Sequence, residues 1–129
     1  MASNFKSTLI FLLLAQPLAA QIKLIKDPTE KRIDVFVENK LFTSFLYPDN
    51  IEKPFLYPVF TTNQTDVTRG FPLNPKPGDP ADHPHHIGIW LNYENVNGLD
   101  FWNNSYAIPK EKKNKYGWIK TNKIIDSFG

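Results

Sequence analysis

All three histidines of the chain lie within four consecutive positions, at His83, His85 and His86. Imidazole exchanges a proton near neutral pH and also binds metal ions through a neutral ring nitrogen. Asp82 directly precedes the cluster, where its carboxylate could accept a ring N–H and orient that ring. In an extended backbone, His83 and His85 would project to one side and His86 to the other, because side chains alternate. Residues 82–86 are therefore the candidate catalytic segment.

This cluster admits three interpretations. In the first, His83 and His85 line a pocket, where one of them acts as an acid, a base or a hydrogen-bond donor toward an organic ligand. In the second, two histidines and a carboxylate form a metal site of the kind that suits iron or zinc, with His86 facing away. In the third, the rings are structural and cap a loop or pack against Trp90. The sequence specifies neither a metal nor a cofactor.

Four residues outside the cluster are candidate ligand-binding groups. The Arg69 guanidinium could anchor a carboxylate or a pair of sugar hydroxyls. Trp90 and Trp102 offer flat aromatic faces, which suit apolar ligand surfaces such as the C–H face of a sugar. Asp100 lies near a turn and could serve as a second carboxylate.

The elements that must position these residues have the patterns of strands. Alternating apolar residues predict three strands in the first part of the chain, over 22–26, 32–38 and 41–47. A two-residue hairpin turn is predicted at Asn39-Lys40. The prolines between 48 and 84 restrict that region to loops and short strands. Further strands are predicted over 87–93, 99–102, 116–119 and 123–125, with a polar loop over 110–115.

No segment after residue 20 shows sustained helical periodicity. The predicted fold is therefore all-β, with antiparallel sheets packed as a sandwich. The first twenty residues differ: Lys6 is followed by a short apolar run over 9–15 and by small residues ahead of Gln21, as in a secretory signal peptide. That run is too short to span a bilayer.

We therefore expect an exported protein, periplasmic or secreted, with a signal-peptide helix over 1–20 and a β-sandwich domain over 21–129. No membrane span is expected after cleavage of the signal peptide. Because residues 124–129 end the chain in an apolar, strand-like segment, the domain is expected to be the N-terminal part of a longer one, and the sandwich to be incomplete.

The overall composition excludes some functions. The formal net charge of +2 is too small to build a surface for polyanions, so no nucleic-acid partner is expected. The absence of cysteine excludes disulfides, thiolate nucleophiles and cysteine-based zinc sites.

Four blocks of the sequence resemble the exported PmoA-type family, whose members carry the name methane oxygenase PmoA. The blocks occur in the family's order and are Lys53-Pro54-Phe55-Leu56-Tyr57-Pro58, Val67-Thr68-Arg69-Gly70, Asp82-His83-Pro84-His85-His86-Ile87-Gly88-Ile89-Trp90 and Asn95-Val96-Asn97-Gly98-Leu99-Asp100-Phe101-Trp102. This chain departs from the family at Ile87, where members usually carry arginine. Members are also longer, which agrees with the expectation of a fragment.

The resemblance implies an exported protein of bacterial carbohydrate utilisation more than an oxygenase. Methane oxidation needs a multi-helix membrane complex that this sequence does not offer. We therefore expect a small-molecule ligand, a carbohydrate-like polyol, bound or acted on through the histidine segment. The alternatives are a metal-dependent oxygenase or hydrolase that uses the same histidines, and a non-catalytic interaction module.

Overall fold

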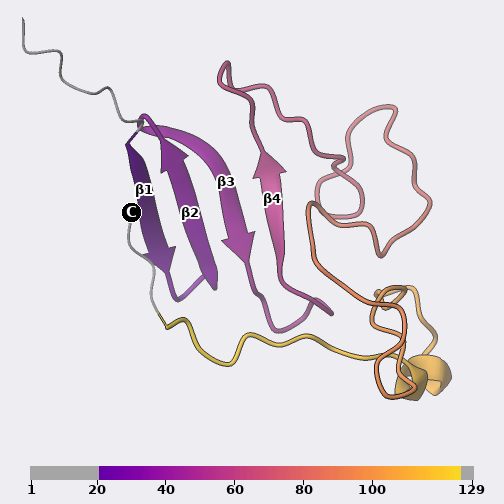
Figure 1. Cartoon of the computed structure of the whole chain (residues 1–129). Coiled ribbons are helices and arrows are strands. Elements are labelled where there is room, and N and C mark those ends of the chain that lie inside the picture. Colours follow the sequence, from indigo (N-terminus) through magenta and orange to yellow (C-terminus); the bar gives the residue numbers. More distant parts are fainter. Residues whose placement is uncertain (1–20, 126–129) are drawn as a thin grey trace, which may run out of the picture.

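The structure is a computed structural model that describes residues 21–125. The predicted signal-peptide helix and the last four residues of the chain lie outside the described residues. Four strands on one side of the molecule lead into a long, irregular loop region on the other (Figure 1). No helix in the described part is long and apolar enough to cross a bilayer.

The four strands form one antiparallel sheet in the order β1-β2-β3-β4, which confirms the all-β, antiparallel class. Their bounds are β1 Ile22–Asp27, β2 Arg32–Val37, β3 Lys40–Leu46 and β4 Phe55–Val59. The three strands predicted between residues 22 and 47 are thus present within one or two residues of their expected ends. Within residues 21–125 all four strands belong to this single sheet.

The predicted hairpin between β2 and β3 is present, but its turn lies one residue earlier than expected. Val37 pairs with Lys40, so the two turn residues are Glu38 and Asn39. Their φ angles are 50° and 63°. Two consecutive positive φ angles are typical of a type I′ turn, whose twist matches that of the flanking strands. Asn39 tolerates this conformation well, whereas Glu38 does not.

The second half of the chain contains fewer strands than its apolar pattern predicts. Instead of strands over 87–93, 99–102 and 116–119, it has isolated bridges that pair Leu56 with Ile89, Val96 with Leu99, and Asp100 with Tyr116. Residues 123–125 have no regular secondary structure. The predicted polar loop at 110–115 is instead the 3-10 helix η1 (Lys110–Lys115).

Gly88 explains why the segment after the histidines does not continue as a strand. Its φ is +50°, which breaks the extended backbone. A Cβ at this position would lie 2.2 Å from the Leu56 carbonyl oxygen, so only glycine allows the segment to approach β4 this closely. Ile89 then exchanges two backbone hydrogen bonds with Leu56, of 2.8 and 2.9 Å.

The best-buried apolar cluster lies between β4 and the loop region. Phe55, Tyr57 and Ile87 form its centre, and Leu46, Ile51, Leu73 and Trp90 pack against it. Ile87 and Trp90 directly follow the histidines, so this cluster anchors the candidate segment to β4.

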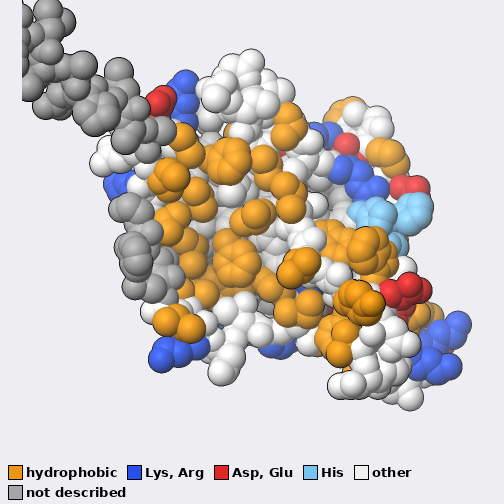
Figure 2. Space-filling view, in the orientation of Figure 1, with side chains coloured by type: hydrophobic (Ala, Val, Ile, Leu, Met, Phe, Trp, Pro, Cys, Tyr) orange, Lys and Arg blue, Asp and Glu red, His pale blue; other side chains and the backbone are white. Residues whose placement is uncertain are grey.

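A wide apolar surface covers the sheet on the face that Figure 2 presents. Ile22, Ile25 and Phe42 are among the large apolar side chains of the strands that remain 40% or more exposed. The histidines form a separate patch at the edge of the loop region, next to basic and acidic side chains (Figure 2).

Candidate functional site

A tight turn gathers the three histidines. The His86 N–H donates to the His83 carbonyl across 2.9 Å, and Pro84 occupies the second position, which proline favours in such turns. The ring centroids of His83 and His86 are 5.0 Å apart, and those of His85 and His86 are 4.3 Å apart. The expected extended backbone, with His86 facing away from the other two rings, is therefore wrong. The turn brings all three rings together.

Asp82 contacts the first ring of this cluster. Its Oδ2 lies 2.7 Å from Nδ1 of His83, as the sequence led us to expect for an orienting carboxylate. Hydrogen bonding to His83 lowers the pKa of the Asp82 carboxyl below its usual value, and the charge of Arg69 contributes in the same direction. Both side chains of the pair are more than half exposed.

Arg69 holds the turn from its other side. One terminal nitrogen donates to the His83 and His86 carbonyls across 2.9 and 3.0 Å. The other donates to the backbone carbonyl and the carboxylate of Asp82, both across 3.2 Å. Because both terminal nitrogens are engaged with residues 82–86, the structure gives Arg69 a positioning role here. It does not place the guanidinium as the ligand anchor that the sequence suggested.

The two predicted tryptophans lie against the histidine turn. The ring centroids of Trp90 and Trp102 are 4.7 Å apart in an edge-on arrangement, and Trp102 also meets His86 edge-on at 6.4 Å. Trp90 is half-buried, whereas Trp102 is 41% exposed. Trp102 is therefore the indole of this pair that presents more surface to a ligand.

Lys53 joins these groups, although the sequence did not single it out. Its Nζ donates to the Trp102 carbonyl across 2.9 Å and lies 4.1 Å from the centre of the Trp90 ring. The side chain precedes β4 and is only 2% exposed. No signal in the sequence pointed to its burial, since a lysine next to a strand is usually solvated.

Asp100, a candidate ligand-binding group, is engaged by its neighbour Asn103. Its carboxylate accepts hydrogen bonds from the backbone and the side-chain nitrogen of Asn103, at 2.9 and 2.7 Å. Its charge still acts on the cluster, because it raises the pKa values of Lys53 and His85 against the effect of burial.

Burial and mutual repulsion lower the pKa values of His85 and His86. Burial is the main cause that lowers the pKa of His85 to about 4, and the charges of His86, Lys53 and His83 add to it. Burial also lowers the pKa of His86. At neutral pH these two rings are therefore uncharged, and each has one nitrogen that can accept a proton or a hydrogen bond.

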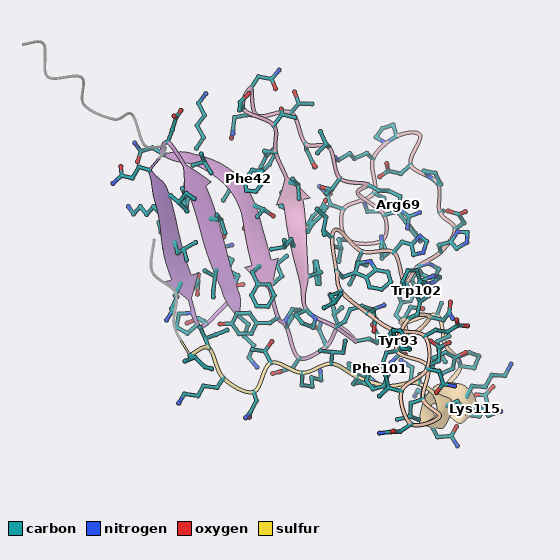
Figure 3. All side chains as sticks on the ribbon, in the orientation of Figure 1. Phe42, Arg69, Tyr93, Phe101, Trp102 and Lys115 are labelled. Atoms are coloured by element: carbon teal, nitrogen blue, oxygen red, sulfur yellow. The ribbon has the colours of Figure 1, made fainter. Side chains whose placement is uncertain are left out.

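An open cleft adjoins Trp102 on the side away from Arg69. We call it the Trp102 cleft; its volume is about 630 Å³, and it is lined by Asn92, Tyr93, Glu94, Asn95, Trp102 and Asn103. Figure 3 shows Trp102 between Arg69 and Tyr93 along the loop region. Tyr93 is 69% exposed, so the cleft presents two aromatic side chains together with amide and carboxylate groups.

A metal site is not evident at the histidines. Among residues 21–125, no group of three or more histidine, aspartate or glutamate side chains is arranged to hold a metal ion.

Comparison with known proteins assigns the chain to a family. The model of the family of unknown function DUF6807 matches residues 32–127, which include strands β2, β3 and β4, the histidine turn and the Trp102 cleft, but not β1. No curated protein and no solved structure matches the chain. The chain therefore belongs to the DUF6807 family.

Proposed function

We propose that this protein binds a carbohydrate-like polyol on the surface formed by the histidine turn and the Trp102 cleft. The observation that carries the proposal is the position of Trp102, whose ring meets His86 and also lines the cleft. The exposed indole of Trp102 thus lies between the uncharged imidazoles and the polar groups of the Trp102 cleft. Indole faces suit the apolar faces of sugar rings, and imidazole and amide groups suit their hydroxyls.

The polar groups of the cleft favour a neutral, hydroxyl-rich ligand. Asn103 is engaged with Asp100, and the side chain of Asn92 bonds to backbone groups of Tyr93 and Phe101. Among the described residues, the Glu94 carboxylate makes no hydrogen bond and no salt bridge. It is therefore free to accept hydroxyl hydrogens, as carboxylates do, and its charge opposes an anionic ligand.

The histidines supply hydrogen bonding at the other end of this surface. His86 is exposed, and its uncharged ring can accept a hydroxyl hydrogen beside the edge of Trp102. The Asp82–His83 pair adds a carboxylate and an oriented imidazole. If the bound polyol reacts, His83, His85, His86 and Asp82 are the groups that would transfer protons.

The resemblance to the exported PmoA-type family agrees with this proposal, since it implies a protein of carbohydrate utilisation. We propose on the same basis that the protein is exported, with residues 1–20 as the signal peptide. We propose no oxygenase reaction at this site on the basis of the name methane oxygenase.

Isothermal titration of the protein with a panel of neutral sugars, sugar alcohols and sugar acids tests the proposal. We expect saturable binding of a neutral member and a loss of at least about tenfold in affinity, or about 1.4 kcal/mol, for Trp102→Ala. Trp118→Ala is the matched control, because Trp118 is similarly exposed at 37% but does not line the cleft. Absence of binding to every member, or equal losses in both variants, would contradict the proposal.

One doubly substituted variant separates this proposal from a non-catalytic module with structural histidines. The doubly substituted protein His83→Ala, His85→Ala should bind the polyol more weakly while its fold, judged by circular dichroism, is retained. A lower melting temperature with unchanged affinity would show that the histidines are only structural.

A further inference from the structure

A second cavity, separate from the Trp102 cleft, lies beneath the histidine turn. We call it the Lys53 pocket; its volume is about 380 Å³, and it shares no lining residue with the cleft. Its polar lining includes Glu52, Lys53, His85 and Asn104, and Leu73 and Ile87 belong to its apolar walls. Of its lining residues, the polyol proposal uses only His85.

Lys53 is placed in this pocket without a carboxylate partner. The side chain is 2% exposed, and its Nζ has only neutral partners: the Trp102 and His85 carbonyls at 2.9 and 3.4 Å and the Trp90 ring face. In the described part of the chain, no aspartate or glutamate forms a salt bridge with it. A buried lysine without such a pair is rare, because burial of an ammonium group is costly.

The surroundings of Lys53 favour the neutral form of its amine more strongly than water would. Burial lowers the pKa of Lys53 to about 8, although the charges of Glu52 and Asp100 oppose that change. A substantial fraction of the side chain is therefore uncharged at mildly alkaline pH. A desolvated lysine of this kind is the side chain that forms Schiff bases with carbonyl compounds.

We propose that the Lys53 pocket is a second site, which takes a small aldehyde or ketone and holds it as an imine on Nζ of Lys53. The neutral amine attacks the carbonyl carbon, so that a C–N bond forms while the carbonyl π electrons move to oxygen, which takes up a proton. That proton comes from the attacking nitrogen, so a neutral carbinolamine results. Its hydroxyl group then takes up the proton that the ammonium group had released and leaves as water, while the nitrogen lone pair forms the C=N bond of the protonated imine. The net change converts one ammonium group and one carbonyl compound into one protonated imine and one water molecule.

The pocket contains the groups that this reaction requires. The Glu52 carboxylate and the uncharged His85 ring both line it and can accept and return protons. A protonated imine keeps one N–H, which can maintain the bond to the Trp102 carbonyl. No external oxidant or reductant is needed.

Asn104 narrows the class of ligand. Its side chain is fully buried and lines the pocket, and its Nδ2 donates to the Gly117 carbonyl across 2.7 Å. Its Oδ1 has no hydrogen-bond partner among the described residues, which is unusual for a buried polar atom. A ligand hydroxyl would satisfy this oxygen, so the favoured ligand is a small hydroxyaldehyde or hydroxyketone.

Reductive trapping tests this site in the intact protein without any substitution. The full chain is incubated with limiting glycolaldehyde and sodium cyanoborohydride, and the modified lysines are located by peptide mapping with mass spectrometry. We expect Lys53 to acquire the hydroxyethyl group before the exposed lysines do, at a rate that rises between pH 7 and pH 9. The finding that exposed lysines such as Lys23 and Lys112 react while Lys53 stays unmodified would overturn the proposal.

A size comparison distinguishes a reaction in the pocket from a reaction after unfolding. An aldehyde attached to dextran is too large for a 380 Å³ cavity, so it should modify exposed lysines and leave Lys53 unchanged. Equal labelling of Lys53 by both reagents would mean that local unfolding exposes the amine, and would also overturn the proposal. Both outcomes are independent of sugar binding at the Trp102 cleft, which the Trp102→Ala titration measures.

Discussion

Replacement of Lys53 by methionine should remove a specific pH dependence of stability. The two side chains have similar length, but methionine cannot be protonated. The pKa of Lys53 is about 8 in the folded chain, below its ordinary value of 10.5. The unfolded chain therefore binds this proton more tightly than the folded chain does, and protonation opposes folding.

The sign and the size of the effect follow from these two values. Below pH 8 the lysine is charged in both states, and the folded state bears the whole cost of the buried ammonium. As the pH rises from 8 to 10.5 that cost disappears, because the folded state releases its proton first. Each pKa unit corresponds to about 1.4 kcal/mol, so the fall from 10.5 to about 8 amounts to about 3 kcal/mol. The side chain is only 2% exposed, so solvent screening removes little of this energy.

The measurement is the free energy of unfolding in urea at pH 7, 8, 9, 10 and 11, followed by tryptophan fluorescence. The stability of the unsubstituted protein, relative to Lys53→Met, should rise by about 3 kcal/mol from pH 7 to above pH 10. Lys112→Met, which changes an exposed lysine of η1, is the control and should show no such rise. If the difference in free energy of unfolding between the unsubstituted protein and Lys53→Met stays constant with pH, the burial argument is refuted.

Three further predictions concern the turn, the imidazoles and the hairpin. Arg69→Lys should lower the free energy of unfolding by about 2–4 kcal/mol and speed hydrogen exchange of the backbone amides over residues 82–86. The reason is that one ammonium group cannot reach all the carbonyl oxygens that the guanidinium contacts. Unchanged amide exchange in this segment would contradict the positioning role. The pKa of His85 is about 4 in the folded chain, below its ordinary value of 6.5. The stability that comes from burying the uncharged ring is therefore fully present above pH 6.5 and is lost as the pH falls toward 4. His85→Gln should therefore reduce acid sensitivity in urea titrations at pH 7 and pH 4. The reduction should be smaller than the full pKa difference, which corresponds to about 3 kcal/mol, because the ring is only half-buried and solvent screens part of the effect. Equal acid sensitivity in both proteins would count against neutral burial. Glu38→Asn should raise the melting temperature through a gain of about 1 kcal/mol, since asparagine tolerates the positive φ of 50° better than glutamate; a lower melting temperature would show that the glutamate side chain stabilises the turn in another way.

The sheet was predictable because its information is local. Ile33, Val35 and Val37 alternate along β2, and the turn that follows requires only two residues in the left-handed region. Such signals act between neighbours in the chain, so a strand and its hairpin can be recognised without knowledge of the rest of the fold. The error of one residue at the turn arose because asparagine was assigned to the first turn position, whereas the structure places it at the second.

The clustering of the histidines was predictable from the sequence, but the geometry of the cluster was not. The spacing of the histidines identified the segment, and an extended backbone was assumed from the apolar run that follows. Pro84 favours a turn instead, and Gly88 then ends the extended conformation through its close approach to Leu56. These two residues act through a hydrogen bond and a contact that strand periodicity does not reveal.

By itself, the sequence determined the all-β class, the three strands at the start of the sheet and the clustering of the histidines within residues 82–86, because alternation and residue spacing act over short distances. Only the tertiary structure decided how the histidine rings face one another, that Arg69 serves the turn, and that Lys53 is buried beneath Trp90. The contacts of Arg69 and of Lys53 join groups separated by more than ten residues in the chain. Burial and the loss of solvation exist only once those groups are packed together, so no local pattern can encode them.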